Sequence, residues 1–109
     1  MHRFLEVLSE GPLLFDGAIG TEFYRRGIYL TKNFEELNLT QPHLVRSVHE
    51  EYVKSGAQVI TTNSYGANRF RLERFGLAAR TVEINRSAAE LALAGAGRAA
   101  WVAGSVGPS

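Results

Sequence analysis

The sequence predicts an α/β fold built on a short parallel sheet. Three runs of strand length, at residues 12–16, 58–63 and 99–109, are rich in apolar side chains and alternate with segments of helical periodicity. Strands joined by helices long enough to cross over form parallel sheets with right-handed connections. The runs are almost continuously apolar before their polar ends, as expected for strands that are covered on both faces.

The first predicted element is a short helix over residues 3–11. Phe4, Leu5 and Leu8 recur at helical spacing, and the pair Gly11-Pro12 ends the pattern. Residues 12–16 then form an apolar run that ends on a carboxylate, and they predict the first strand.

A second helix is predicted between Thr40 and Gly56. Thr40 is suited to cap the first amides, and Pro42 is tolerated in the first turn. Gly56 is suited to the left-handed conformation that ends a helix. The apolar residues of this segment fall on one side of the helix. They are Leu44, Val45, Val48, Tyr52 and Val53.

The remaining elements are a β-branched strand at 58–63, a helix at 79–97 and a third strand within 99–109. The helix is rich in alanine and leucine, and we expect Gly95 and Gly97 to end it. Three parallel strands with two crossover helices leave both sheet edges without partners. We therefore expect these residues to open a larger domain.

One segment, residues 68–75, interleaves three arginines with two phenylalanines and could indicate nucleic-acid binding. The near-zero net charge of the chain favours another interpretation. We expect a solvated helix face whose Phe70 and Phe75 turn inward.

The bulk composition is that of an ordinary globular domain and excludes several functional classes. Of 109 residues, 45% are hydrophobic and 21% charged, and the formal charge of +1 favours a small-molecule or protein partner over nucleic acid or a membrane. The chain has no cysteine, so it builds neither a disulfide framework nor a thiolate metal site. Glu6 and Glu10 interrupt the N-terminal segment, which does not resemble a signal peptide, and we expect a cytoplasmic protein.

Polar or small residues follow the apolar part of each predicted strand. They are Asp16-Gly17, Thr61-Thr62-Asn63 and Gly104-Ser105. The carboxyl ends of parallel strands lie at one edge of the sheet, where ligands bind in α/β proteins. Two interpretations stand at this point: Asp16 contacts a ligand, or it forms an Asx turn or a helix cap at the strand exit. Thr62 and Asn63 have the same alternative, since such residues often satisfy loop amides.

Two other motifs are weak. Gly17 and Gly20 are spaced G-x-x-G, which lacks the third glycine of a dinucleotide loop and the lysine of a phosphate loop. His43 and His49 lie six residues apart on the second helix, about 240° around its axis. We therefore expect two surface histidines and no shared metal site.

The ordered motifs of the chain resemble the homocysteine S-methyltransferase family. The resemblance is carried by LLFDGAIGTEFYRRG, then by NFEELNLTQPHLVRSVHEEYVKSGAQVITTNSYGANRFRLERFGL, then by EINRSAAELA and VAGSVGPS. It extends from Leu13 to Ser109 and is most similar to the homocysteine-binding module of cobalamin-dependent methionine synthase and of bacterial fusions with methylenetetrahydrofolate reductase. It implies that residues 1–109 are the N-terminal portion of a homocysteine-binding domain, roughly the first three β/α units of a (β/α)8 TIM barrel.

The resemblance also implies a reaction and a site. Family members transfer a methyl group to the homocysteine thiol, which is bound as a thiolate by zinc on three cysteines of later strands. Methylcobalamin, methyltetrahydrofolate, S-methylmethionine and betaine are the donors used. By position, Asp16 matches the aspartate that recognises the substrate ammonium, Gly17 the residue whose amide faces the substrate carboxylate, and Thr62 a substrate-contacting threonine. Asn63 and Ser105 are further candidates, and Glu22 is a candidate for the rim.

The resemblance implies that this chain binds the amino-acid end of the substrate and that residues outside it bind the zinc. We expect the 109 residues alone to be inactive and to bind no zinc. An alternative stays open, a non-catalytic α/β binding or assembly module that keeps only the first barrel strands.

Overall fold

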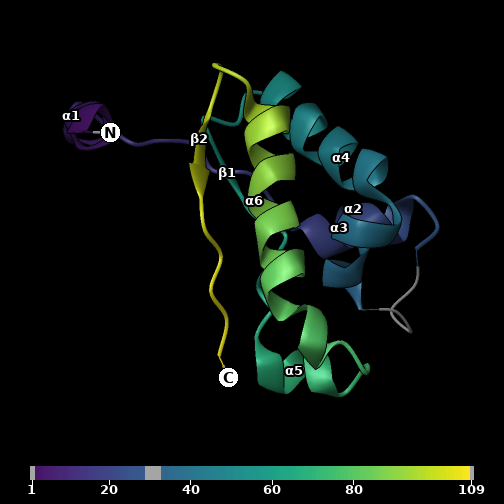
Figure 1. Ribbon diagram of the computed structural model, residues 1–109. Coiled ribbons are helices and arrows are strands. Elements are labelled where there is room, and N and C mark those ends of the chain that lie inside the picture. Colours follow the sequence, from purple (N-terminus) through teal and green to yellow (C-terminus); the bar gives the residue numbers. More distant parts are fainter. Residues whose placement is uncertain (1, 29–32, 109) are drawn as a thin grey trace.

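The computed structural model describes residues 2–28 and 33–108 (Figure 1). In chain order its regular elements are the helices and strands α1 (His2–Ser9), α2 (Ile19–Arg25), α3 (Leu37–Thr40), α4 (Pro42–Lys54), β1 (Val59–Thr61), α5 (Arg69–Glu73), α6 (Thr81–Ala96) and β2 (Trp101–Ala103), with 3-10 turns at Phe34–Glu36 and Ala78–Arg80. The predicted strand, helix, strand, helix, strand order is recognisable in this series, although α2, α3 and α5 are additional to it.

The sheet is parallel, as the sequence predicted. Strands β1 and β2 pair in the register Val59↔Trp101, Ile60↔Val102 and Thr61↔Ala103. The third predicted strand is therefore confirmed only over residues 101–103, and Ser109 lies outside the described residues.

The predicted strand at 12–16 is reduced to a single parallel bridge between Phe15 and Val59. The backbone N–H of Asp16 donates to the Val59 carbonyl at 2.9 Å, so the segment does lie beside β1. The Gln58 side chain takes the Leu14 N–H, and both Gln58 and Val59 donate to the Leu14 carbonyl. These irregular hydrogen bonds replace the evenly spaced bonds of a parallel strand pair. The strand expected at 12–16 is therefore an extended segment with one β-bridge.

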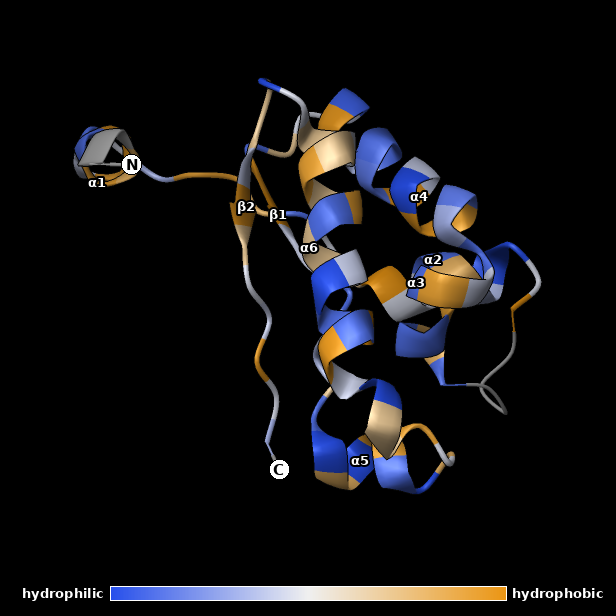
Figure 2. Cartoon of the chain, viewed as in Figure 1, coloured by the Kyte–Doolittle hydropathy of each residue, from blue (hydrophilic) through white to orange (hydrophobic). Residues whose placement is uncertain are grey.

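The two long helices lie on the same side of the strand pair and pack against each other (Figure 1). The buried apolar residues form three clusters, to which α2, α3, β1 and α5 also contribute. Polar and apolar residues alternate along both helices in Figure 2, and α6 also exposes Val82 and Leu93. The buried residues of α4 are Val45, Val48 and His49, and those of α6 are Ile84, Ala88, Ala92 and Ala96. By contrast α1 stands apart from this core, with Phe4 against Trp101 at 5.9 Å between ring centroids.

Several predicted helix ends need correction. Helix α4 begins with Pro42 as expected, but Thr40 closes α3 instead of capping α4, and its hydroxyl donates to the Glu36 carbonyl at 3.4 Å. The Gly56 assignment is confirmed by its φ of 108°. Gly97, with φ of 55°, ends α6, whereas Gly95 lies within that helix.

The phenylalanines of the 68–75 segment do not turn inward. Phe70 is 63% exposed and Phe75 is 50% exposed, while Leu72 is fully buried. The rotational phase of α5 is set by Asn68, whose side-chain oxygen accepts the Arg71 N–H at 3.0 Å and caps the helix. That cap places Leu72 on the core side.

Candidate functional site

The carboxylate of Asp16 is held by Thr61, the last residue of the neighbouring strand β1. Its Oδ2 accepts the backbone N–H of Thr61 at 3.0 Å, and the Thr61 hydroxyl lies 3.3 and 3.4 Å from the two carboxylate oxygens. Burial raises the pKa of the Asp16 carboxyl, and the hydrogen bonds from Thr61 lower it in part. The side chain caps no helix, since Ala18 precedes α2. Asp16 is therefore not the helix cap that the sequence offered as one alternative.

Gly17 lies directly against a tyrosine of α4. A Cβ at Gly17 would be 2.8 Å from the Tyr52 hydroxyl oxygen, and that hydroxyl donates to the Ala18 carbonyl at 3.1 Å. No acceptor within the described residues takes the Gly17 N–H. The glycine thus permits the close approach of Tyr52 and leaves an exposed amide for a ligand.

Acidic side chains surround this tyrosine. Burial raises the pKa of the Tyr52 phenol, and the negative charges of Glu22 and Asp16 raise it further. Glu22 also lines a polar hollow of about 150 Å³ beside Tyr52 and forms an ion pair of 3.6 Å with Arg25. The predicted rim residue therefore lies in the electrostatic neighbourhood of Asp16.

Thr62 and Ser105 meet across the two strand ends in a closed ring of hydrogen bonds. The Ser105 N–H donates to the Thr62 hydroxyl oxygen at 3.0 Å, and the Ser64 hydroxyl donates to the Ser105 carbonyl at 2.8 Å. Because Ser64 has given its one proton, Thr62 must donate to Ser64 in the 2.6 Å contact between their hydroxyls. Thr62 is left with one oxygen lone pair, which can accept from a ligand such as an ammonium group.

Asn63 lies in the interior. It is 2% exposed, and its amide nitrogen donates to the Phe34 carbonyl at 2.9 Å and to the Asn38 side-chain oxygen at 3.0 Å. Asn38 in turn donates to the carbonyls of Asn63 and Ile84. Asn63 therefore connects the end of β1 to the 33–36 segment directly, and to α6 through Asn38.

The histidine prediction fails for one of the two residues. His43 is exposed, but His49 is fully buried between α4 and α6, and neither ring nitrogen has a hydrogen-bond partner among the described residues. The apolar face of α4 is wide enough to include position 49, and Gly95 of α6 leaves room for its side chain. Burial lowers the pKa of His49 to about 4, so the ring is neutral at pH 7.

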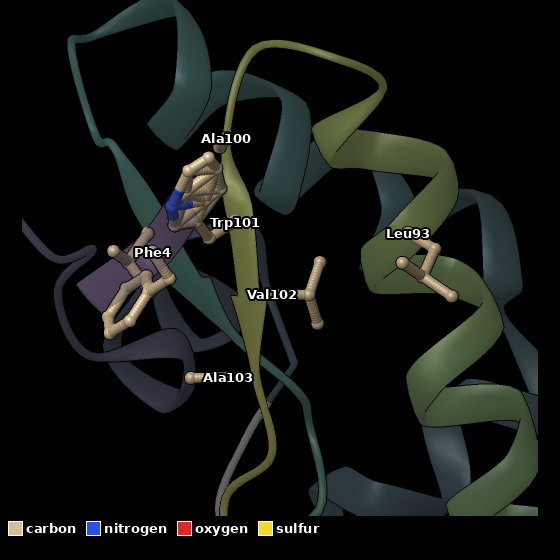
Figure 3. Close-up of a pocket in the computed structure, with 7 residues that line it drawn as sticks. Phe4, Leu93, Ala100, Trp101, Val102 and Ala103 are labelled. Carbon is tan, nitrogen blue, oxygen red and sulfur yellow. The ribbon is translucent and has the colours of Figure 1, made fainter. Parts of the chain in front are cut away.

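One hollow is lined only by apolar residues. It has a volume of about 470 Å³ and is lined by Phe4, Val59, Leu93, Ala100, Trp101, Val102 and Ala103. Figure 3 shows Phe4 and Trp101 on one side of β2 and Val102 directed toward Leu93 of α6 on the other. Its lining offers no charged group for an amino acid, so the amino-acid site is better assigned to the strand ends.

Comparison with known proteins connects this geometry to a family. The sequence profile described as Homocysteine S-methyltransferase matches residues 13–109. The chain belongs to the homocysteine S-methyltransferase family. It is 37% identical over 108 residues to the Homocysteine S-methyltransferase of Escherichia coli, covering 88% of this chain and 35% of that protein. It is 30% identical over 117 residues to the Methionine synthase of Mycobacterium tuberculosis, covering 95% of this chain and 10% of that protein.

Solved structures of the family agree. The metallated form of the E. coli homocysteine methyltransferase MmuM is similar to the chain with a TM-score of 0.77 at 34% identity, covering 94% of this chain and 40% of that one. The oxidized form of the same protein is similar to the chain with a TM-score of 0.74 at 36% identity, covering 88% of this chain and 37% of that one. The chain thus spans well under half the length of the homocysteine S-methyltransferases that it matches.

The residues of this family member do not fit a metal centre by themselves. The chain has no cysteine, and within residues 2–28 and 33–108 no three His, Asp or Glu side chains lie together as metal ligands do. The three thiolates that the resemblance implies for zinc cannot come from these residues. No described helix is long and apolar enough to cross a membrane.

Sequence reasoning missed the residues that position the site. Thr61 fixes Asp16, Ser64 closes the ring with Thr62, and Tyr52 packs on Gly17. Thr61 belongs to the polar strand end that the sequence indicated, but its partner lies 45 residues away. Tyr52 was assigned to the apolar face of a helix, and nothing in that pattern indicated its contact with the glycine.

Proposed function

We propose that the protein containing this chain transfers a methyl group to the thiol of homocysteine to form methionine, and that these residues hold the amino-acid end of the substrate. Family membership supports the reaction. One observation supports the assignment of the amino-acid end. A carboxylate fixed by Thr61 and an exposed backbone N–H lie on the adjacent residues Asp16 and Gly17.

The substrate has two charged groups at that end, and the site offers a partner for each. The Asp16 carboxylate accepts a hydrogen bond from the ammonium group, and the Gly17 N–H donates to the carboxylate. The remaining lone pair of Thr62 is a second acceptor for the ammonium. Asn63 and Ser105 position the site without contacting the substrate. Asn63 fixes the strand end, and Ser105 orients the Thr62 hydroxyl.

The remaining parts of the proposal concern the complete protein. Its domain is a (β/α)8 TIM barrel, with residues 1–109 as the N-terminal portion and roughly the first three β/α units. Zinc is held by cysteines outside these residues, so we expect the chain alone to be inactive. The methyl donor is methylcobalamin, methyltetrahydrofolate, S-methylmethionine or betaine, and we propose a cytoplasmic location.

The second candidate is a non-catalytic binding or assembly module. Such a module would keep only the first barrel strands and would lack the zinc half. Stoichiometric zinc and methionine formation in the complete protein support the enzyme. Homocysteine binding without zinc or methionine formation supports the module.

The amino-acid site is tested by Asp16→Asn in the complete protein, with homocysteine affinity measured by calorimetry. The substitution keeps the shape and one acceptor oxygen but removes the charge. We expect a loss of about 1.5–3 kcal/mol in binding, the range for a charge-assisted hydrogen bond. Glu10→Gln removes a charge from the segment after α1 and is the matched control. Unchanged affinity in Asp16→Asn rules out contact with the ammonium.

A further inference from the structure

A third cavity, of about 300 Å³, is distinct from the amino-acid site and combines cations with aromatic rings. We call it the arginine–aromatic cavity. Its lining residues are Asn33, Phe34, Glu35, Tyr65, Gly66, Arg71, Arg74 and Phe75. It lies between the 33–36 segment and α5, next to the loop that begins at Thr62.

Neither arginine of the cavity is neutralised. The ion pairs among the described residues join Arg25, Arg26, Arg46 and Arg80 to glutamates, and none includes Arg71 or Arg74. The two are spaced i, i+3, so their side chains leave the same side of the short helix and its C-cap. Their guanidinium groups therefore remain available to an external anion.

The position of Arg71 is set from both ends. Asn68 holds its backbone N–H at 3.0 Å, and its guanidinium lies over the Tyr65 ring at 6.0 Å from the centroid. A cation–π contact at this distance uses the charge of the guanidinium and leaves its N–H groups free to donate. Both contacts keep Arg71 on the cavity side of α5.

The one acidic residue of the cavity is already engaged. The Oε2 atom of Glu35 accepts the Gly66 N–H at 3.1 Å, and a Cβ on Gly66 would lie 3.1 Å from the other carboxylate oxygen, Oε1. Asn63 holds the adjoining Phe34 carbonyl. These two bonds fix the wall opposite the arginines, and the cavity carries two guanidinium groups against one carboxylate.

The cavity also has aromatic surface without a complete cover. Phe75 is 50% exposed and Tyr65 is 55% exposed. A planar ring can stack on such a surface, since aromatic faces attract one another in offset and edge-to-face arrangements. Exposed aromatics beside unpaired arginines therefore favour a ligand that has both a ring and an anionic group.

We propose that the arginine–aromatic cavity binds a small molecule in which a carboxylate or phosphate adjoins a planar ring. Arg71 and Arg74 donate to the anion, since guanidinium forks match both groups, and Phe75 contacts the ring. A volume of about 300 Å³ suits a molecule of that size. The inference does not rest on methyl transfer, because no lining residue belongs to the amino-acid site.

The test uses the complete, isotope-labelled protein and follows the amide resonances of Gly66 and Phe75. Two probes separate the anion sources: hippurate has a ring and a carboxylate, and phenyl phosphate has a ring and a phosphate. Benzamide has only the ring, acetate only the carboxylate, and benzyltrimethylammonium a ring and a positive charge. We expect saturable shifts with at least one of the first two probes and none with the other three.

Substitutions then assign the contacts. Arg71→Gln and Arg74→Gln are each expected to lower the affinity for the anionic probe about tenfold or more, because a hydrogen bond to a charged group is lost. Arg74→Lys keeps the charge and should restore part of the affinity. Arg69→Gln is the matched control, since Arg69 is an exposed arginine of the same helix that does not line the cavity.

Three results overturn the proposal. They are no saturable shift with either anionic probe, equal binding of benzamide, and an equal loss in Arg69→Gln. Tight binding of a single-stranded oligonucleotide that Arg69→Gln also abolishes indicates an extended nucleic-acid surface instead of a small-molecule site. Homocysteine affinity is measured in the same variants and should stay unchanged, so failure here is separable from failure of the proposed methyl transfer.

Discussion

A Cβ on Gly95 of α6 would lie only 2.6 Å from the Cβ of His49 on α4. The two longest helices of the structure therefore meet at a point where one of them has no side chain. This contact connects a glycine that the sequence assigned to a helix end with a histidine that it assigned to the surface.

The first prediction follows from that distance. Gly95→Ala should destabilise the protein by about 1–3 kcal/mol, the usual cost of overpacking, despite the higher helix propensity of alanine. The midpoint of urea unfolding, followed by circular dichroism, measures the change. Gly104→Ala is the control, since a Cβ there meets open space. Equal midpoints for the two variants contradict the close contact.

The second prediction concerns pH. The folded-state pKa of His49, about 4, lies below the ordinary value of 6.5. Its neutral ring thus contributes stability that is complete above pH 6.5 and is lost as pH falls through about 4. Since one pKa unit is worth about 1.4 kcal/mol, the loss approaches about 3 kcal/mol. Unfolding free energies between pH 8 and 4 measure it.

The matched variant for this titration is His49→Leu, which should show a flatter dependence over the same interval. Comparing slopes is necessary because the pKa of Asp16 is raised, so its ionised form costs stability and protonation restores it as pH falls. Asp16 therefore acts in the opposite direction to His49. A slope that His49→Leu leaves unaltered assigns the acid loss to other groups.

The third prediction tests the ring that joins the strand ends. Thr62→Val removes both the donor and the acceptor of this hydroxyl and leaves the Ser105 N–H without a partner. We expect a loss of about 1–2 kcal/mol in unfolding free energy. Thr62→Ser, which keeps the hydroxyl, should retain most of the stability, and Thr21→Val at an exposed position of α2 is the control. If Thr62→Val costs no more than Thr62→Ser, the ring of hydrogen bonds does not contribute the expected stability.

The fourth prediction concerns the carboxylate of Asp16. Thr61→Val deletes the hydroxyl that lies 3.3 Å from Oδ1 but keeps the backbone donor. Because hydrogen bonds to the ionised form lower a pKa, their loss should raise the pKa of Asp16 further. A carboxyl-carbon titration by NMR measures the change, with Thr61→Ser expected to stay near the wild type. A fall in the pKa contradicts the assigned contact.

Residue patterns predicted those parts of the fold that depend on local sequence and parallel pairing. The helix predicted at 79–97 is present as α6 at 81–96, and the strand predicted at 58–63 is present only over residues 59–61. The hydrogen bond between Thr62 and Ser105 agrees with the common edge that parallel strands share. The pattern at 12–16 failed because a strand requires a regular partner, and the Gln58 side chain intervenes. Five residues of sequence show neither the pairing partner of a strand nor a side chain from elsewhere in the chain that takes its N–H group.

The other errors have tertiary causes. Phe70 and Phe75 are exposed because Asn68 sets the phase of α5, and His49 is buried because Gly95, 46 residues away, leaves space for it. Helix α2 was missed because Gly17 and Gly20 indicated a turn, although Ile19 and Phe23 have helical spacing. In the candidate site, sequence indicated Asp16, Gly17 and Thr62 but not the tyrosine and threonine that position them.

The ring contact between Phe4 and Trp101 has a practical consequence for anyone who studies unfolding of this protein. Trp101 is the only tryptophan of the chain, and it lies at the end of the sheet against α1, away from the helix interface. Its emission therefore reports detachment of α1, whereas circular dichroism at 222 nm reports the two long helices. Transitions that fail to coincide between the two optical signals would reveal α1 as a separately melting unit.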